Sequence, residues 1–119
     1  MKNIIKQFIQ AVENRDADAT AQFFAEDIHF ENVPEASVIK GKKAVYEKFK
    51  GFFEMTSKIQ WNIEREVFSE NVAMIERKTH VCFQGKDIVM PIVSVIEITN
   101  EKISLFRDYF DAESFAKQL

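Results

Sequence analysis

An arginine and an aspartate occur where side-chain alternation along two expected strands turns them toward the same interior. Over residues 72–83, Arg77 shares one strand face with Ile75, Thr79 and several other apolar side chains. A guanidinium among apolar groups needs a carboxylate and further acceptors to offset its desolvation. Asp108 is the natural partner, because it shares the inward face of the segment 102–110 with Phe106. In such a pair the arginine can hold the aspartate carboxylate in place, and the carboxylate can accept or donate a proton.

Asn32 is the third polar candidate. It shares a face with Phe30 on a short expected strand. We therefore expect Asn32, Arg77 and Asp108 to form a site with catalytic capacity, in a pocket also lined by Phe30, Ile75, Thr79 and Phe106. The structural alternative is an ion pair that fixes strand register, with Asn32 satisfying a turn near Pro34.

The remaining polar residues favour no other chemistry. Alternation places His29 and His80 on the faces opposite Phe30 and Arg77, so we expect neither in the site. One cysteine, Cys82, and two histidines exclude a Cys/His metal cluster, and the sequence has no phosphate loop or nucleophile elbow. We expect no metal and no cofactor, and the lone cysteine indicates a reducing compartment.

Helical spacing predicts the elements of the first half. Apolar residues from Ile4 to Val12 form one stripe and predict a helix over 3–14. A short helix follows, with Asp16 as its N-cap, and the spacing from Val45 to Phe53 predicts a third helix over 42–55.

The second half changes to a period of two. Turn residues divide it into strands near 58–68, 72–83, 87–98 and 102–110, which predict an antiparallel meander. A short strand over 28–32 precedes the third helix, and Asp111 caps a last helical turn. Helices on one face of such a sheet make an α+β fold. A curled sheet would enclose an apolar pocket, although we expect most of the twelve phenylalanines to fill a dry core.

Composition limits the possible partners. With 119 residues, 46% of them hydrophobic, the chain fits one compact domain spanning residues 1–119. A net charge of -3 and no basic cluster beyond the lysines of 40–50 argue against nucleic acid. No apolar run reaches membrane-spanning length, so we expect a cytoplasmic protein that binds neither nucleic acid nor a membrane.

Several segments resemble the limonene-1,2-epoxide hydrolase family, which is part of the nuclear-transport-factor-2-like, or SnoaL-like, superfamily. They are Phe24-Ala25-Glu26-Asp27, Asn32-Val33-Pro34, Gly41-Lys42-Lys43-Ala44-Val45, Glu76-Arg77 and the run from Lys102 to Asp111. The resemblance extends in register over nearly the whole chain. It implies a cone-shaped α+β fold, a curved antiparallel or mixed sheet wrapped around N-terminal helices with an internal pocket, and a homodimer built through the sheet.

The resemblance also implies roles. In that family an Asp-Arg-Asp unit opens an epoxide: one Asp takes a proton from a water held by Tyr and Asn, and the other protonates the oxirane oxygen. Asp108 matches the base, Arg77 the bridging arginine and Asn32 the water-positioning amide. Phe30 stands in the tyrosine position and Thr79 in the acid position.

These two departures have chemical consequences. A threonine hydroxyl is too weak an acid to replace a carboxylic acid, whose loss costs about 10²- to 10⁴-fold in rate. We also expect Arg77 to lower the pKa of Asp108 and weaken it as a base. Three functions therefore stay open: an altered epoxide hydrolase, a dimeric binding protein for a small apolar molecule, and another SnoaL-like chemistry such as a cyclase or dehydratase. The ketosteroid isomerases of the same superfamily fit worse, because Phe8, Asn32 and Val93 replace their functional residues.

Overall fold

The helices of the first half pack their apolar stripes against the sheet. The computed structural model describes all residues, 1–119, with α1 at Lys2–Glu13, α2 at Ala17–Ala21 and α3 at Lys42–Glu54. Asp16 caps α2 by accepting a hydrogen bond from the backbone N–H of Ala19 at 3.0 Å. The helices predicted at 3–14 and 42–55 are confirmed to within one residue at each end. None of the helices is long and apolar enough to cross a membrane.

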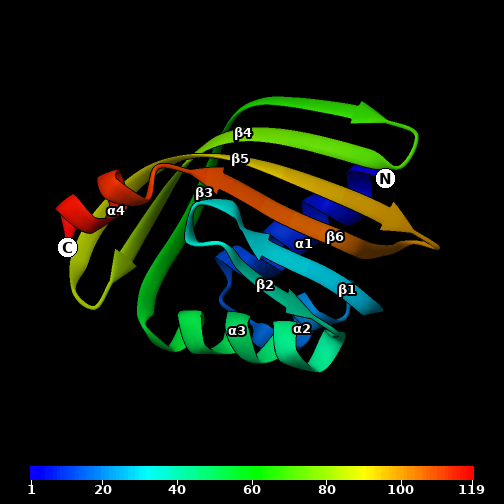
Figure 1. Cartoon of the computed structure of the whole chain (residues 1–119), viewed down its shortest axis with the longest axis horizontal. Coiled ribbons are helices and arrows are strands. Elements are labelled where there is room, and N and C mark those ends of the chain that lie inside the picture. Colours follow the sequence, from blue (N-terminus) through cyan, green and yellow to red (C-terminus); the bar gives the residue numbers. More distant parts are fainter.

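Six strands form one curved sheet in the order β2-β1-β6-β5-β4-β3. The last four strands are long and antiparallel: β3 at Thr56–Ser69, β4 at Val72–Phe83, β5 at Lys86–Thr99 and β6 at Lys102–Phe110. Figure 1 shows these strands bending along their length, with the helix α4 (Ala112–Gln118) beside the turn between β4 and β5. The predicted α+β fold with a curved sheet and N-terminal helices is confirmed, and so is the antiparallel meander.

The edge of the sheet formed by β1 and β2 differs from the prediction. β1 spans Phe24–Asn32 and pairs with β6 in parallel, with a register irregularity between Phe24 and His29. A short 3-10 helix, η1 (Val33–Glu35), then leads into β2 (Ser37–Lys40), which the sequence analysis missed. Ala36 turns the chain between them with a φ of 51°. β2 has only four residues, too few for alternation to reveal it.

A cluster of buried apolar side chains fills the space between the helices and the inner face of the sheet. Phe8 on α1, Phe24 on β1 and Phe106 on β6 are almost fully buried there. Their rings meet at centroid distances of 5.6 to 6.3 Å, within the range of favourable aromatic pairs. This cluster gives the inner ends of β4, β5 and β6 a rigid support.

Candidate functional site

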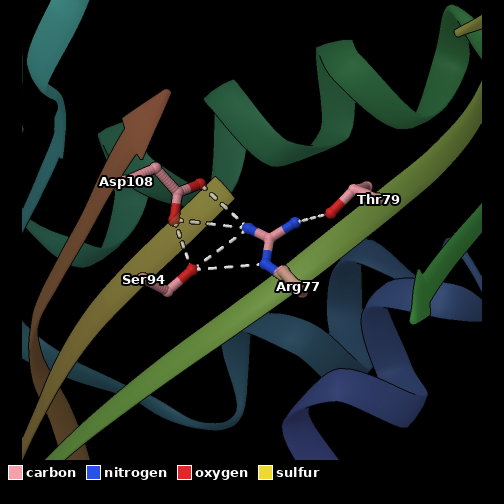
Figure 2. Close-up of polar contacts among 4 residues, drawn as sticks. All are labelled: Arg77, Thr79, Ser94 and Asp108. Atoms are coloured by element: carbon pink, nitrogen blue, oxygen red, sulfur yellow. Dashed lines mark hydrogen bonds and ion pairs between the residues drawn. The ribbon is translucent and has the colours of Figure 1, made fainter. Parts of the chain in front are cut away.

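Three adjacent strands bring four polar side chains together on the inner face of the sheet. Arg77 and Thr79 lie on β4, Ser94 on β5 and Asp108 on β6. Ser94 pairs directly with Asp108 across β5 and β6, and Arg77 pairs with Ile92, two residues before Ser94. Figure 2 shows the other three side chains converging on the guanidinium of Arg77.

Every nitrogen of the Arg77 guanidinium donates a hydrogen bond. Nη2 donates to the two carboxylate oxygens of Asp108 at 3.3 and 3.2 Å and to Ser94 Oγ at 3.1 Å. Nε also donates to Ser94 Oγ, at 3.3 Å, and Nη1 donates to Thr79 Oγ1. The Ser94 hydroxyl in turn donates to Asp108 Oδ1. The side chain of Arg77 is 3% exposed and that of Asp108 is 13% exposed, so this is a buried network in which each guanidinium nitrogen has an acceptor.

Trp61 on β3 covers the guanidinium from one side. The Cζ atom of Arg77 lies 3.5 Å from the centroid of the Trp61 ring, which is cation–π geometry. The backbone N–H of Trp61 donates to the carboxylate of Glu13 on α1 at 2.9 Å, so a helix fixes this part of the strand. The pairing of β3 with β4 shifts by one residue between Ile63 and Arg65, immediately beyond the point where Arg77 pairs. A bulge at this position ends the inward-facing run that carries Trp61.

Burial changes the proton affinities of the pair in opposite directions. Desolvation raises the pKa of the Asp108 carboxyl above its ordinary value, although the charge of Arg77 and the hydrogen bonds from Ser94 and Arg77 act against this. Desolvation likewise lowers the pKa of Arg77, while Asp108 acts to raise it. Arg77 acts to lower the pKa of Asp108, as expected, but our expectation that the pKa would be lowered overall is wrong. The loss of solvent around the carboxylate outweighs the effect of the guanidinium, so the net shift of the pKa is upward.

Asn32 lies at the end of β1, directly beside Asp108 in the parallel pairing with β6. Its side chain caps no turn and makes no hydrogen bond within the protein, although the 3-10 helix η1 begins at the next residue. The turn-satisfying role near Pro34 that we considered is therefore absent. Phe30 is buried and stacks on Phe106 at a centroid distance of 5.6 Å, so an apolar ring occupies the position before Asn32 on this face.

A cavity of about 440 Å³ opens over this network. Of its 23 lining residues, 15 are hydrophobic, and the volume lies within the range of small-molecule sites. The predicted residues in the lining are Phe30, Asn32, Arg77, Thr79, Phe106 and Asp108. Ile75, which we expected in the lining, is instead fully buried in the core, two residues before Arg77 on β4. There it lies too deep between the helices and the sheet to reach the cavity.

Phenylalanines supply much of the cavity wall. Eight of the twelve line it, so our expectation that most of them fill only a dry core is wrong. Periodicity along the helices and strands does not record the space left between α3 and the sheet. The eight are Phe30, Phe49, Phe52, Phe53, Phe83, Phe106, Phe110 and Phe115.

The C-terminal helix α4 covers one side of the cavity. Phe115 from α4 lines the cavity and packs edge-on against Phe83 at a centroid distance of 6.0 Å. The Gln118 amide accepts from the N–H of Val89 and donates to its carbonyl, both at 2.9 Å. This two-point contact fixes α4 on the part of β5 that β6 does not reach. Asp111 caps the helix as predicted.

Sequence reasoning missed two residues that contact Arg77, Ser94 and Trp61. Trp61 lines the cavity, whereas Ser94 is fully buried and is not part of the lining. Ser94 is a small hydroxyl between Val93 and Val95, and nothing in the sequence sets it apart from a serine on a solvated strand. The one indication that Ser94 points inward is that it shares a strand face with Ile92 and Ile96. His29 and His80 lie off the site, as predicted, where they form contacts with Glu31 and Asp87. No cluster of three or more His, Cys, Asp or Glu side chains could hold a metal ion.

The family model for the limonene-1,2-epoxide hydrolase catalytic domain matches residues 1–119, the full chain. The chain belongs to this family. The resemblance noted in the sequence is thereby confirmed, and it applies to the strands that carry Arg77 and Asp108 as well as to the helices.

Solved structures show the same fold at low sequence identity. A limonene-epoxide-hydrolase-like epoxide hydrolase of M. tuberculosis is 23% identical, with a TM-score of 0.86 over 98% of this chain and 86% of that one. A putative SnoaL-like polyketide cyclase from Shewanella denitrificans is 16% identical, with a TM-score of 0.88 over 98% and 94% of the two chains. A protein with a ketosteroid isomerase-like fold from Catenulispora acidiphila, in complex with trimethylamine, is 16% identical, with a TM-score of 0.86 over 97% and 90%. These likenesses confirm the nuclear-transport-factor-2-like, SnoaL-like fold.

Proposed function

We propose that this member of the family binds a small, mainly hydrocarbon molecule in the cavity and that Asp108 acts there as a base on a water molecule. The observation that carries the proposal is a carboxylate held by Arg77 and Ser94 at the floor of an apolar cavity. The raised pKa of Asp108, caused by burial, suits a general base better than an ordinary aspartate does. Family membership favours epoxide hydrolysis as the reaction.

The proposed step uses the groups that face the cavity. A water bound to the Asn32 amide gives a proton to Asp108 while its oxygen attacks a carbon of the epoxide. The C–O bond breaks, and the ring oxygen leaves as an alkoxide that accepts a hydrogen bond from the Thr79 hydroxyl. The alkoxide then takes a proton from solvent at the cavity mouth, Asp108 returns its proton to solvent, and the product is a vicinal diol.

Thr79 limits the rate of this reaction. The hydroxyl can stabilise negative charge by hydrogen bonding but does not supply a proton as a carboxylic acid does. We therefore expect turnover about 10²- to 10⁴-fold slower than in a site with an acid at this position.

A second candidate, binding without turnover, is favoured by the same residue. Thr79 accepts a hydrogen bond from Arg77 where an epoxide hydrolase of this design needs an acid, and Phe30 offers no hydroxyl for the water. In this alternative the Arg77–Asp108 pair orients a ligand. A cyclase or dehydratase that uses Asp108 as acid or base is a third candidate, favoured by the raised pKa that burial gives this carboxyl.

Hydrolysis of limonene-1,2-epoxide and smaller epoxides in ¹⁸O-labelled water tests the proposal. We expect one labelled oxygen in the diol from the native protein and loss of the reaction in Asp108→Asn. Asp87→Asn, an exposed carboxylate on the outer face, is the matched control and should leave the rate unchanged.

A double variant separates the candidates. Thr79→Asp with Phe30→Tyr restores the two groups that the family resemblance implies. If the double variant hydrolyses the epoxide and the native protein does not, the result would support binding without hydrolysis as the native function. Absence of turnover in both proteins would exclude epoxide hydrolysis and leave binding without turnover and the cyclase or dehydratase as candidates.

We further propose that two copies associate through the outer face of the sheet. Large apolar side chains are exposed there on four adjacent strands: Val67, Met74, Val89, Val93 and Tyr109. A surface of this kind marks an interaction site, and its self-complementary apolar character suits a second copy. Sedimentation should give a dimer for the native protein and a monomer for Met74→Glu. Met55→Glu, at the cavity mouth, should remain dimeric.

A further inference from the structure

The floor of the cavity has hydrogen-bonding capacity that the protein does not use. The Thr79 hydroxyl accepts from Arg77 Nη1, and its own proton has no acceptor within the protein. Asp108 Oδ1 accepts from both Ser94 and Arg77, whereas Oδ2 accepts only from Arg77. The Asn32 amide has no partner at all. The floor therefore offers a ligand one donor at Thr79, one acceptor at Asp108 Oδ2, and both kinds of group at Asn32.

The two ends of this floor are held apart by one guanidinium. Asp108 is bonded to Nη2 of Arg77 and Thr79 to Nη1, and Figure 2 shows them on opposite sides of the arginine. A ligand that bonds to both therefore has to reach across the guanidinium. Two neighbouring oxygen atoms on a ligand reach both, one donating to Asp108 and the other accepting from Thr79.

The charges around the cavity floor restrict the class of ligand further. Arg77 balances the charge of Asp108, and all three guanidinium nitrogens are already bonded within the protein. An anionic ligand at Asp108 would meet the carboxylate beside a guanidinium that is already bonded, because the other basic side chain of the lining, Lys48, is exposed on α3. A cationic ligand would lose its hydration among aromatic side chains beside a carboxylate that is already paired. The oxygen-bearing end of the ligand is therefore neutral, and the apolar walls require the rest to be hydrocarbon.

We infer that the cavity selects small hydrocarbon molecules that carry two neighbouring oxygen atoms, at least one of them a hydroxyl: vicinal diols and α-hydroxy ketones. An epoxide or an ether offers acceptors but no hydrogen for Asp108, so Asp108 Oδ2 gains no hydrogen bond from such a ligand. The inference rests on the proposed ligand-binding function but not on hydrolysis. It also means that a diol formed in this site would leave it slowly.

Binding of three molecules with one carbon skeleton tests this preference. The probes are p-menthane-1,2-diol, p-menthan-2-ol and p-menthan-2-one, and the reporter is the fluorescence of Trp61, the single tryptophan, which lines the cavity. We expect the alcohol to bind at least about 10-fold tighter than the ketone, because it donates to a charged acceptor. The diol should bind roughly 2- to 10-fold tighter than the alcohol, since it adds a neutral hydrogen bond from Thr79.

Variants at Thr79 assign the second oxygen. Thr79→Val keeps the shape and removes the donor, so the diol should bind no tighter than the alcohol, whereas Thr79→Ser should retain the difference. Thr99→Val, an exposed threonine on β5 outside the cavity, is the matched control and should behave as the native protein.

Two results would overturn the inference, and only one of them would also contradict the proposed ligand-binding function. Equal affinity of the native protein for the three probes would show that the cavity does not discriminate between ligands by their oxygen atoms, while ligand binding itself would stand. Binding of none of the three would exclude the inference together with the proposed ligand-binding function.

Discussion

Glu76 and Arg77 are neighbours on β4, yet their ion pairs lie on opposite faces of the sheet and in opposite environments. Arg77 points inward to Asp108, and the two side chains are 3% and 13% exposed. Glu76 points outward to Arg65, and those side chains are 43% and 77% exposed. The inner pair has Ser94, Thr79 and Trp61 around it, whereas the outer pair is open to solvent in a single copy of the chain.

The contrast shows what makes an ion pair useful for chemistry. Water solvates the outer charges, so their pairing contributes about 0–1 kcal/mol and leaves each group close to its independent behaviour. Burial removes that solvation from the inner pair, and the partners then depend on each other and on the neighbouring hydroxyls. The raised pKa of Asp108 follows from the lost solvation, against the opposing effects of Arg77 and Ser94. One step along the strand separates the buried pair from the exposed pair.

Removal of each arginine tests the comparison with the largest expected effect. Arg77→Met leaves the buried Asp108 carboxylate without its partner, so the free energy of unfolding should fall by about 3–5 kcal/mol. Arg65→Met should lower it by less than about 1 kcal/mol. Urea denaturation of both variants at neutral pH measures the difference.

A double variant identifies the cause of the larger loss. Arg77→Met combined with Asp108→Leu removes both charges, and we expect it to recover a substantial part of the stability lost in Arg77→Met alone. If Arg77→Met and Arg65→Met cost the same, the inner pair would not be energetically distinct and the comparison would fail.

Ser94→Ala sharpens the comparison at the next level of effect. Without the hydroxyl, Asp108 Oδ1 and Arg77 Nε each lose a hydrogen-bond partner in a buried place, which should cost about 1–3 kcal/mol. Ser57→Ala on β3 is the control, because Ser57 is exposed and makes no side-chain hydrogen bond. Denaturation in urea again gives the values, and equal stability of the two variants would show that Ser94 does not hold the pair together.

Much of the fold could be predicted from the sequence because its signals are periodic and long. The four strands of the meander and the helices α1 and α3 repeat their patterns over nine or more residues, and their bounds came within a few residues of those observed. β2 and the parallel pairing of β1 with β6 escaped prediction. β2 has only four residues, too few for alternation to reveal it, and the pairing of β1 with β6 joins segments about 75 residues apart, which alternation within one segment does not record.

The sequence predicts that the side chains of the site point inward, but it does not predict the pKa shift of Asp108. Alternation placed Arg77 and Asp108 on inward faces, yet the direction of the Asp108 pKa shift depends on how completely the strands exclude water from the carboxylate. The sequence holds no measure of that exclusion. Ser94 and Trp61 escaped notice for a related reason, since each acts only through its position around a third residue, Arg77.

The pH dependence of stability tests the raised proton affinity of Asp108. Because burial raises the pKa of this carboxyl in the folded state above its ordinary value of 3.8, the folded protein holds this proton at a pH where the unfolded chain has lost it. The stability of the native protein relative to Asp108→Asn should therefore fall as the pH rises from about 4 through the raised pKa. A relative stability that instead rises over this range would mean that Arg77 dominates and the pKa is lowered. Glu76→Gln, measured in the same series, controls for the loss of one carboxylate from the chain.

The dependence of stability on salt concentration is the test with the smallest expected effect. It distinguishes the exposed ion pair from the buried one, because salt screens exposed charges only. Mobile ions screen exposed charges, with a Debye length of about 10 Å at 0.1 M and about 3 Å at 1 M salt, but they do not enter a buried network. Glu76→Gln should therefore cost less than about 1 kcal/mol at low salt and nothing measurable at 1 M sodium chloride. The cost of Arg77→Met should stay the same between these conditions, because Arg77 is only 3% exposed and mobile ions do not surround it. Each variant is compared with the native protein at the same salt concentration, so general salt effects on unfolding cancel. A salt-sensitive cost at Arg77 would mean that mobile ions reach the pair, and the argument that burial raises the pKa of Asp108 would lose its physical basis.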